Sequence, residues 1–513
     1  MLFNRFNLWY FPNPEQAGFR PKQGCLFQIF SIYIIMEYLK SIGKSLYVGF
    51  LDYEKAFDFV NRANIIEHLK EQGAGSKFTK AVAAMYKETF YIPKLCNKIG
   101  KSISAKHGVI QGRQTSTSFF SFEVHKMPDS VNVHDSIINN FNLLQLADDT
   151  ALLSEEKAFL CVQFEQCFKF SARNYMFPNV DKTYFLHLAD VPDTEPIILD
   201  ESSSINSAIN NEYVYLGMKF IASDSIVKHI KKNLADRMFH VNKFYDWLHV
   251  NESTPIIVKI QVLYTCMFNA YLYGSETWWK IDELNNQLLL LERKILKTIL
   301  CVKNNTPDDI LYLELNKHDI VASIKQRQYS FFKRLLALNE DEAVVRKIVS
   351  FYRNLPICNY YDTLAPDIIT VNKSSRYDKL QNGTSTYIAR YRQLIDPPLN
   401  HVIYDSYLPE DLRKIITRWR LSSHRLKIET GRQEVPFLHR NLRLCSECTV
   451  LEDEQHVMFY CPRYARIRLK YTAYLRNYSV VEKVFNPVNK NDALLLGNYL
   501  HEIEKCREAL GLQ

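Results

Sequence analysis

The sequence predicts a mixed α+β domain in its first half and a helical second half. Apolar side chains alternate along residues 45–52, which indicates a β-strand. Residues 141–153 form two apolar arms around an acidic pair, and this pattern predicts a β-hairpin. From about residue 225 onward the spacing of apolar residues becomes helical. We therefore expect an α+β fold class, with the strands confined to the first half.

Helices are indicated by apolar spacing and by the residues that start helices. Residues 28–42 predict a buried helix, and the pattern from 53 to about 90 is helical as well. Thr254 and Pro255 supply an N-cap and a first helical residue. Two apolar stripes follow, formed by Ile256, Ile260, Leu263 and Met267 and by Leu284, Leu288, Leu291 and Ile295.

Composition limits the class of protein. The chain has 513 residues, which is enough for about three domains. Hydrophobic residues make up 47%, so wholesale disorder is excluded. The net charge of +8 suits a polyanionic partner but does not by itself identify one. Eleven scattered cysteines indicate a reducing compartment, and no apolar run reaches the length of a membrane span. We expect an intracellular protein without a membrane partner.

Three aspartates are candidate metal ligands. Asp52 ends the first predicted strand, and Asp148 and Asp149 lie at the tip of the hairpin. Nucleotidyl transfer uses two divalent metals about 4 Å apart, and Mg²⁺ prefers a few carboxylates together with substrate phosphates. By itself, an acidic pair between two strands is more commonly a solvated turn. The carboxylates alone therefore leave both interpretations open.

Seven short blocks, in this order, resemble the reverse transcriptases of non-LTR (LINE-type) retrotransposons. They are EQAGFRP at 15–21, FLDYEKAFD at 50–58, GVIQG at 108–112, LADD at 146–149, NVDKT at 179–183, YLG at 215–217 and YLYGSETW at 271–278. The resemblance implies a right-hand polymerase fold. It also implies that Asp52, Asp148 and Asp149 hold Mg²⁺ or Mn²⁺.

The resemblance implies further roles around the nucleotide. Phe57 would be the aromatic gate that excludes a 2′-hydroxyl, with core packing as the alternative. Lys55, Gln111 and Gly112 would line the nucleotide and template pocket. Lys182 would donate a proton to the pyrophosphate or neutralise it, with an ordinary exposed lysine as the alternative.

The chain departs from the family pattern in several places. Thr117 stands where the family has proline, Leu146 where it has an aromatic residue, and Phe27 where Asp is common. The family's earlier finger strands and its upstream endonuclease domain would lie before Met1. We therefore expect an N-terminally truncated element, either a fragment or a decayed copy.

A cysteine–histidine cluster near the C-terminus predicts a zinc site. Cys445, Cys448, His456 and Cys461 supply three thiolates and an imidazole, a tetrahedral zinc set. The spacing resembles the C-terminal CCHC knuckle of non-LTR retrotransposons. The alternative is a chance grouping of cysteines in a helical tail.

A basic stretch at residues 411–443 precedes this cluster. Nine Lys and Arg residues stand against three acidic ones, and Trp419, Phe437, His424 and His439 are interleaved. Such a pattern favours phosphate contacts and base stacking, as on a nucleic-acid surface. The alternative is a solvated helix face.

Five regions follow from these patterns and from the resemblance. We expect a remnant of fingers at 1–45, a palm at 46–222, a helical thumb at 223–350, a linker at 351–400 and a basic zinc-knuckle region at 401–513. The Pro-containing and Ser/Asn/Gly-rich composition of the fourth region predicts a loose connector.

The resemblance implies RNA-directed DNA polymerisation by a nucleotidyltransferase. Its partners would be an RNA template, a DNA primer or target and deoxynucleoside triphosphates, with Mg²⁺ and Zn²⁺ as metals, in the cytoplasm and nucleus. The alternative is a catalytically inactive, nucleic-acid-binding relic of such an element. An intron maturase is a third possibility that the thumb and knuckle match less well.

Overall fold

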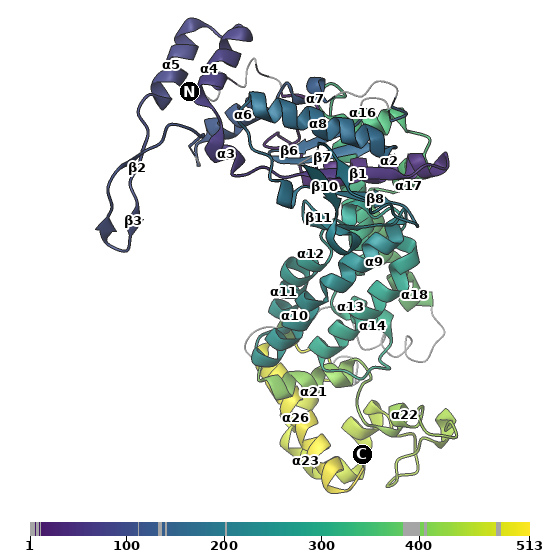
Figure 1. Cartoon of the computed structure of the whole chain (residues 1–513). Coiled ribbons are helices and arrows are strands. Elements are labelled where there is room, and N and C mark those ends of the chain that lie inside the picture. Colours follow the sequence, from purple (N-terminus) through teal and green to yellow (C-terminus); the bar gives the residue numbers. More distant parts are fainter. Residues whose placement is uncertain are drawn as a thin grey trace. The chain divides into compact units, whose positions relative to one another are not determined.

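The computed structural model describes most of the chain (Figure 1). It covers residues 6–512 except 7–9, 11, 111, 132–135, 139–140, 201–202, 383–400, 405–407 and 479–483. Within these described residues, no helix is both long and apolar enough to cross a membrane.

The chain forms two compact units. The first consists of residues 1–235, 274–280 and 328–364. The second consists of residues 236–273, 281–327 and 365–513. Each unit is therefore assembled from segments that are distant in sequence. Neither unit has the boundaries of any one of the five predicted regions.

A six-stranded sheet forms the centre of the first unit, in the order β6-β7-β1-β8-β10-β9. β1 lies between β7 and β8 and is antiparallel to both. The strands are β1 (Leu46–Leu51), β6 (Leu143–Leu146), β7 (Asp149–Ser154), β8 (Tyr184–Leu188), β9 (Ile197–Ile198) and β10 (Ser204–Ser207). The predicted strand and hairpin are confirmed and are adjacent in the sheet. A separate ribbon is formed by β11 (Glu212–Tyr215) and β12 (Met218–Ile221).

Helices pack on this sheet because its strands are apolar on both sides. α2 (Cys25–Ser41) contacts β6 and β1, and α8 (Lys157–Arg173) contacts β7 and β1. Gly49 permits the close approach of α8, since a Cβ there would come within 2.6 Å of the Phe164 ring. The other helices of this unit are α3 (Ala56–Phe59), α4 (Arg62–Glu71), α5 (Ser76–Tyr86), α6 (Gln114–Glu123), α7 (Met127–Ser130), α9 (Ile226–Asp236), α16 (Val344–Phe351) and α17 (Pro356–Asp362).

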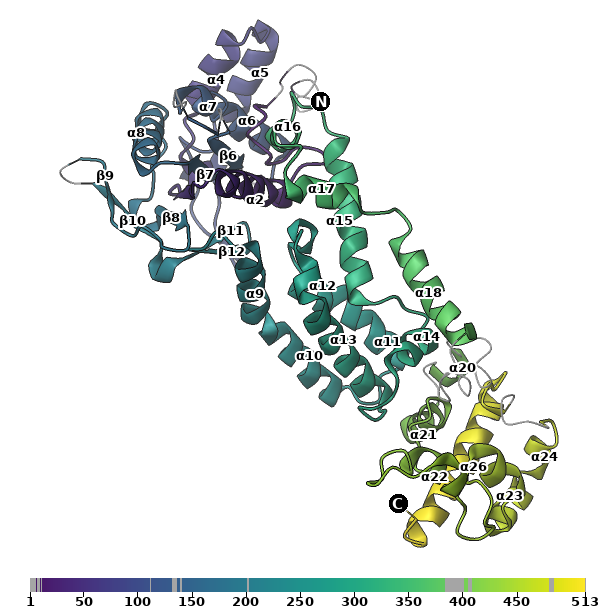
Figure 2. The same cartoon turned by 90° about the vertical axis from the view of Figure 1, so that its right-hand side faces the viewer.

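The second unit is helical, as the sequence predicts. α10, α11 and α13 lie side by side (Figure 2). Its helices are α10 (Met238–Val250), α11 (Ile256–Val262), α12 (Phe268–Tyr271), α13 (Asn285–Leu300), α14 (Asp308–Glu314), α18 (Ile368–Asn382), α20 (His401–Tyr404), α21 (Glu410–Arg420), α22 (Lys427–Thr430), α23 (Ala465–Lys470), α24 (Thr472–Leu475) and α26 (Lys490–Ala509). α15 (Ile320–Leu336) contributes residues to both units.

The predicted linker at 351–400 is wrong over its described part. Residues 356–362 form α17, in which Tyr361 is 2% exposed. Residues 368–382 form α18, where Arg376 makes an ion pair of 2.5 Å with Asp319. Buried contacts to other elements stabilise these helices, although the local composition resembles that of a loop. Residues 383–400 lie outside the described residues.

The C-terminal region is not a separate body from the helices of the second unit. Arg420 on α21 donates two hydrogen bonds to Glu314 on α14, and both side chains are 0% exposed. Breaking a buried pair of this kind typically costs about 3–5 kcal/mol. The predicted boundary at 401 therefore passes through a packed interior.

Candidate functional site

The predicted metal ligands meet at one end of the central sheet. Leu51 on β1 pairs with Thr150 on β7, so the next residues outward, Asp52 and Asp149, face each other across the same two strands. Leu146 pairs with Asp149, which leaves Ala147 and Asp148 as the turn of the β6–β7 hairpin. Three carboxylates from two separate chain segments therefore gather at one edge.

Electrostatics show that these carboxylates interact. Asp149 is exposed at the end of β7, but partial desolvation, and then the charges of Asp148 and Asp52, raise its pKa to about 6. The pKa of Asp52 is also raised, first by desolvation and further by Asp148, while Lys182 opposes the shift. Like charges gathered at one edge are unfavourable, Lys182 offsets them only in part, and this donor set suits a hard divalent cation.

A short turn holds the end of β1 in place. The Asp52 amide donates to the Thr183 hydroxyl at 3.3 Å, and the Asn179 amide donates to the Asp52 carbonyl at 2.9 Å. The Thr183 hydroxyl in turn donates to the Asn179 carbonyl at 2.8 Å. These bonds fix the NVDKT block beside the carboxylates. Lys182, in the same turn, is exposed, and its charge reaches Asp52.

Phe57 lies in α3, which begins five residues after the last residue of β1. Its ring is half-buried and stacks on Phe120, with 4.3 Å between centroids and 19° between planes. Its backbone carbonyl accepts from the Val109 amide at 2.9 Å, which ties it to the GVIQG loop. Both interpretations of Phe57, gate and packing residue, are compatible with this position. Lys55 is exposed and has a left-handed backbone, with φ of 45°.

The GVIQG loop needs its first glycine. Gly108 has φ of 80°, and a Cβ there would lie 2.5 Å from the Asp58 carbonyl oxygen. The Arg62 guanidinium donates to the carbonyls of Gly108 at 2.7 Å and Ala105 at 2.6 Å. Gly112 also has a left-handed backbone, with φ of 83°. Gln111 lies outside the described residues.

Sequence reasoning assigned no role to Arg62 or to Gln16. Gln16 is 1% exposed, and its side-chain amide bonds to both backbone groups of Ala147, the turn residue before Asp148. A buried Gln inside the EQAGFRP block is the one signal that could have indicated such a role, because buried amides need partners.

The four predicted zinc ligands also come together. Their ligand atoms all lie within 4.8 Å of one another. The Cys448–Cys461 and Cys445–Cys461 sulfur distances are 3.7 and 3.9 Å. A tetrahedral zinc with Zn–S bonds of about 2.3 Å has S–S edges of about 3.8 Å. Nε2 of His456 is buried and has no hydrogen-bond partner, so it is available as the fourth ligand.

Short local bonds position these ligands. The Cys445 amide donates to the Val450 carbonyl at 2.7 Å, which closes the turn that carries Cys445 and Cys448. The Cys461 amide donates to the His456 carbonyl at 2.8 Å. The cluster is thus held by backbone bonds, and its geometry fits zinc. Cysteines grouped by chance would have no reason to place four ligand atoms at the spacing of a tetrahedral site.

The basic stretch at 411–443 is largely structural, which corrects both interpretations given above. Arg413, Arg420 and Arg443 are 2%, 0% and 3% exposed. Three more cations form ion pairs, namely Lys414 with Glu410, Lys427 with Glu434 and Arg432 with Glu429. Trp419 and His424 are each 1% exposed and cannot stack on bases. The stretch therefore presents few free cations.

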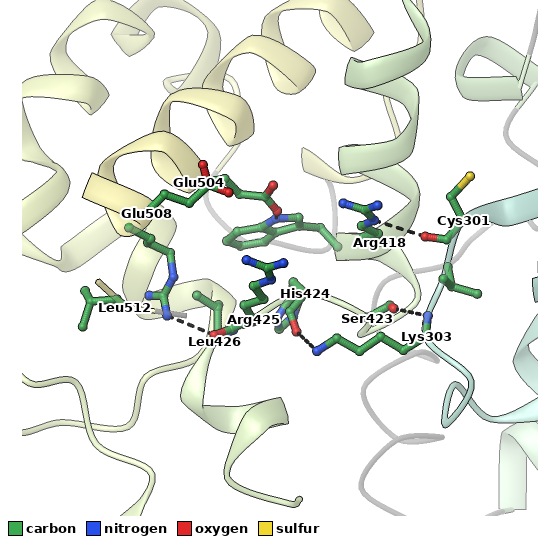
Figure 3. A pocket seen from close by; sticks show the side chains of 13 residues that line it. Cys301, Lys303, Arg418, Ser423, His424, Arg425, Leu426, Glu504, Glu508 and Leu512 are labelled. Carbon is green, nitrogen blue, oxygen red and sulfur yellow. Dashed lines mark hydrogen bonds between the residues drawn. The ribbon is translucent and has the colours of Figure 1, made fainter. Parts of the chain in front are cut away.

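Two of the remaining arginines line a cavity of about 290 Å³ in the second unit (Figure 3). Arg418 and Arg425 lie there with Lys303, whose Nζ donates to the His424 carbonyl at 3.0 Å. Desolvation, and then the charge of Arg425, lower the pKa of Lys303. Glu504 and Glu508 share the lining. This mixture of charges does not select a class of ligand.

Comparison with known families identifies the first unit. Residues 7–220 match the family described as reverse transcriptase (RNA-dependent DNA polymerase). This segment contains the sheet, the three carboxylates and the GVIQG loop. Residues 7–220 therefore belong to the reverse transcriptase family.

A curated relative from a retrotransposable element is also similar to this chain. The retrovirus-related Pol polyprotein from a type-2 retrotransposable element of Drosophila melanogaster is 25% identical over 239 residues, which is 44% of this chain. The match spans 22% of that polyprotein. The chain is thus similar to part of the polyprotein of a retrotransposable element.

Solved structures of telomerases are also similar. Telomerase from Candida albicans in complex with a telomeric RNA fragment gives a TM-score of 0.28 at 13% identity, covering 69% of this chain and 57% of that one. Apo telomerase from Candida tropicalis gives 0.32 at 12% identity, covering 71% and 60%. These TM-scores are low, so the likeness adds no further assignment.

Proposed function

We propose that this chain is the polymerase of a non-LTR retrotransposon, which extends a primer 3′-hydroxyl on an RNA template by two-metal nucleotidyl transfer. The observation that carries the proposal is the meeting of Asp52 with Asp148 and Asp149 at one edge of the sheet. Carboxylates brought together at one edge of a sheet serve phosphoryl transfer better than they serve folding, because their mutual repulsion is unfavourable.

Asp52, Asp148 and Asp149 would hold Mg²⁺ or Mn²⁺. Ions held there would supply Lewis-acid polarisation of the transferred phosphoryl group and a lower pKa for the attacking hydroxyl. The chain itself positions the substrates. Phe57, stacked on Phe120, would place a flat wall beside C2′ of the sugar. Lys182 would contribute positive charge near the leaving pyrophosphate.

The remaining roles are those that the resemblance implies. Lys55, Gln111 and Gly112 would line the nucleotide and template pocket. The palm would comprise residues 46–222, and Cys445, Cys448, His456 and Cys461 would hold a structural Zn²⁺. Template RNA, a DNA primer or target and deoxynucleoside triphosphates would be the partners, in the cytoplasm and nucleus.

Primer extension by the purified full-length chain tests the proposal. With an RNA template, a DNA primer, deoxynucleotides and Mg²⁺, we expect extension that requires both template and metal. The double variant Asp52→Asn/Asp148→Asn should extend nothing while still binding primer–template. If the wild-type chain binds the duplex but adds no nucleotide with Mg²⁺ or Mn²⁺, the alternative of an inactive nucleic-acid-binding relic is correct.

A further inference from the structure

An exposed arm extends from the first unit between α5 and α6 (Figure 1). Its base is formed by β2 (Phe90–Tyr91) and β5 (Ile103–Ser104), and its tip by β3 (Lys94–Leu95) and β4 (Lys98–Ile99). Every residue from 90 to 104 is exposed. The arm therefore contributes nothing to the core, and its side chains are available to a partner.

The base of the arm is firmly attached. The Ala105 amide donates to the Thr89 carbonyl at 2.8 Å, which closes the ribbon. Arg62 donates to the Ala105 carbonyl at 2.6 Å and places its guanidinium 4.9 Å from the centre of the Tyr86 ring. The same Arg62 holds Gly108 of the GVIQG loop. A partner held by the arm would thus be tied to the loop that is expected to line the template pocket.

The arm is basic. Its lysines are Lys87, Lys94, Lys98, Lys101 and Lys106, whereas Glu88 is the one acidic residue between 87 and 106. All five lysines are exposed, and none of them forms an ion pair with a carboxylate in the described part of the chain. A net charge of +4 on one thin ribbon is unfavourable without a polyanion nearby.

The arm also exposes apolar and aromatic side chains. Phe90, Tyr91 and Ile92 are 56%, 47% and 59% exposed, and Leu95 and Ile99 are 80% and 74% exposed. Tyr91 opposes Ile103, and Lys94 opposes Ile99 in the register. Cations are therefore interleaved with flat and aliphatic surface along the ribbon. Apolar groups exposed at this density mark an interaction surface.

We propose that the arm binds the single-stranded RNA template ahead of the active site. Lysines would contact the backbone phosphates, and the rings of Phe90 and Tyr91 would stack on unpaired bases, a combination that binds single strands regardless of sequence. The charge argues for a polyanion over an apolar protein partner. The inference rests on the proposed function for its choice of RNA template, whereas the basic surface itself does not depend on catalysis.

Binding measured without nucleotides tests this proposal. The full-length chain is titrated against a fluorescent single-stranded RNA at several salt concentrations. The variant Lys94→Gln/Lys98→Gln/Lys101→Gln should bind at least about tenfold more weakly, and the slope of log K against log salt should become shallower by about 2, because each lost phosphate contact on a single strand contributes about 0.7. The control Lys70→Gln/Lys77→Gln/Lys80→Gln removes the same charge from exposed positions of α4 and α5 and should change both quantities little.

A second variant tests the stacking role. Phe90→Ser/Tyr91→Ser leaves the charge unchanged and should weaken RNA binding by about tenfold, with the salt slope unaltered. Unchanged thermal midpoints show that these exposed substitutions leave the fold intact. Equal affinity and slope for the arm and control variants would overturn the proposal and leave a protein partner as the explanation of the exposed surface. Arm-dependent binding by a chain that extends no primer would instead overturn the proposed function and keep the arm.

Discussion

Gln16 holds both backbone groups of Ala147, the residue that begins the turn carrying Asp148. The Ala147 amide donates to Oε1 of Gln16 at 2.7 Å, and Nε2 of Gln16 donates to the Ala147 carbonyl at 3.0 Å. Ala147 has φ of 59°, a conformation that a residue with a Cβ adopts at a cost. The side chain of Gln16 therefore stabilises a strained turn, and through it the position of the Asp148 carboxylate.

Gln16→Met should uncouple this turn from the rest of the fold. Methionine has a similar length but removes both hydrogen bonds to Ala147 in a part-buried turn, which costs about 0.5–1.5 kcal/mol for each bond. We expect the rate of primer extension to fall about tenfold or more and the Mg²⁺ concentration for half-maximal rate to rise, with duplex affinity unchanged.

The control for this prediction is Gln72→Met, at an exposed position after α4. It should change neither the rate nor the Mg²⁺ dependence. If Gln16→Met lowers the thermal midpoint but keeps the wild-type rate and Mg²⁺ dependence, Gln16 stabilises the fold and does not position the metal ligands.

Asp149→Asn should stabilise the metal-free chain at neutral pH. The folded protein raises the pKa of Asp149 from 3.8 to about 6, so the neutral form is favoured in the folded state. Its contribution to stability is present below pH 3.8 and is lost as the pH rises through about 6. The thermal midpoint of the variant should therefore exceed that of the wild type above pH 6, and the difference should shrink as the pH falls toward 4.

Thermal melts in a chelator at several pH values check this expectation. The matched control is Asp129→Asn, an exposed aspartate on α7, which should show no such pH-dependent difference. Excess Mg²⁺ should reverse the order, because only the wild type keeps all three carboxylates. A midpoint difference that is independent of pH would mean that folding does not raise the pKa of Asp149.

Local patterns were sufficient for β1, β6 and β7, three of the six strands of the sheet, and for the acidic turn between β6 and β7. The alternation in 45–52 and the hairpin around Asp148 and Asp149 are short-range signals, and the antiparallel pairing of the two follows from the sheet. The four zinc ligands lie within 17 residues, so their spacing was informative as well. In each of these cases the information lies in residues that are close together in the chain.

Long-range pairing could not be predicted in the same way. Glu314 and Arg420 are 106 residues apart. Nothing in the local composition of either segment shows that the two side chains form a buried ion pair. The basic stretch therefore resembled a nucleic-acid surface, although its buried arginines serve the fold. Gln16 and Ala147 are 131 residues apart, and their contact was equally invisible. The helices at 356–382 form for the same reason, because distant partners bury them.

Phe57→Val should change the choice of sugar. If Phe57 is the gate, removing its ring opens space beside C2′ of the incoming nucleotide, and the ratio of ribonucleotide to deoxynucleotide incorporation should rise at least about tenfold. Single-nucleotide addition efficiencies measure the ratio. Phe120→Leu, which removes the ring on which Phe57 stacks, should give a smaller change because the gate itself remains. An unchanged ratio in an active Phe57→Val enzyme would make Phe57 a packing residue.

The full-length chain should bind about one zinc through Cys445, Cys448, His456 and Cys461, because their ligand atoms already lie at tetrahedral spacing. Cys448→Ser should lose the metal, since serine does not supply a thiolate, and should make the 445–461 segment more susceptible to proteolysis. α21 should stay folded in this variant, because the buried Arg420–Glu314 pair attaches it independently of the metal. Cys266→Ser, at an exposed cysteine outside the cluster, is the matched control and should keep full zinc content. Metal analysis after purification under reducing conditions with zinc supplied decides the matter, and less than about a tenth of an equivalent in the wild-type chain would show that the four side chains meet without binding zinc.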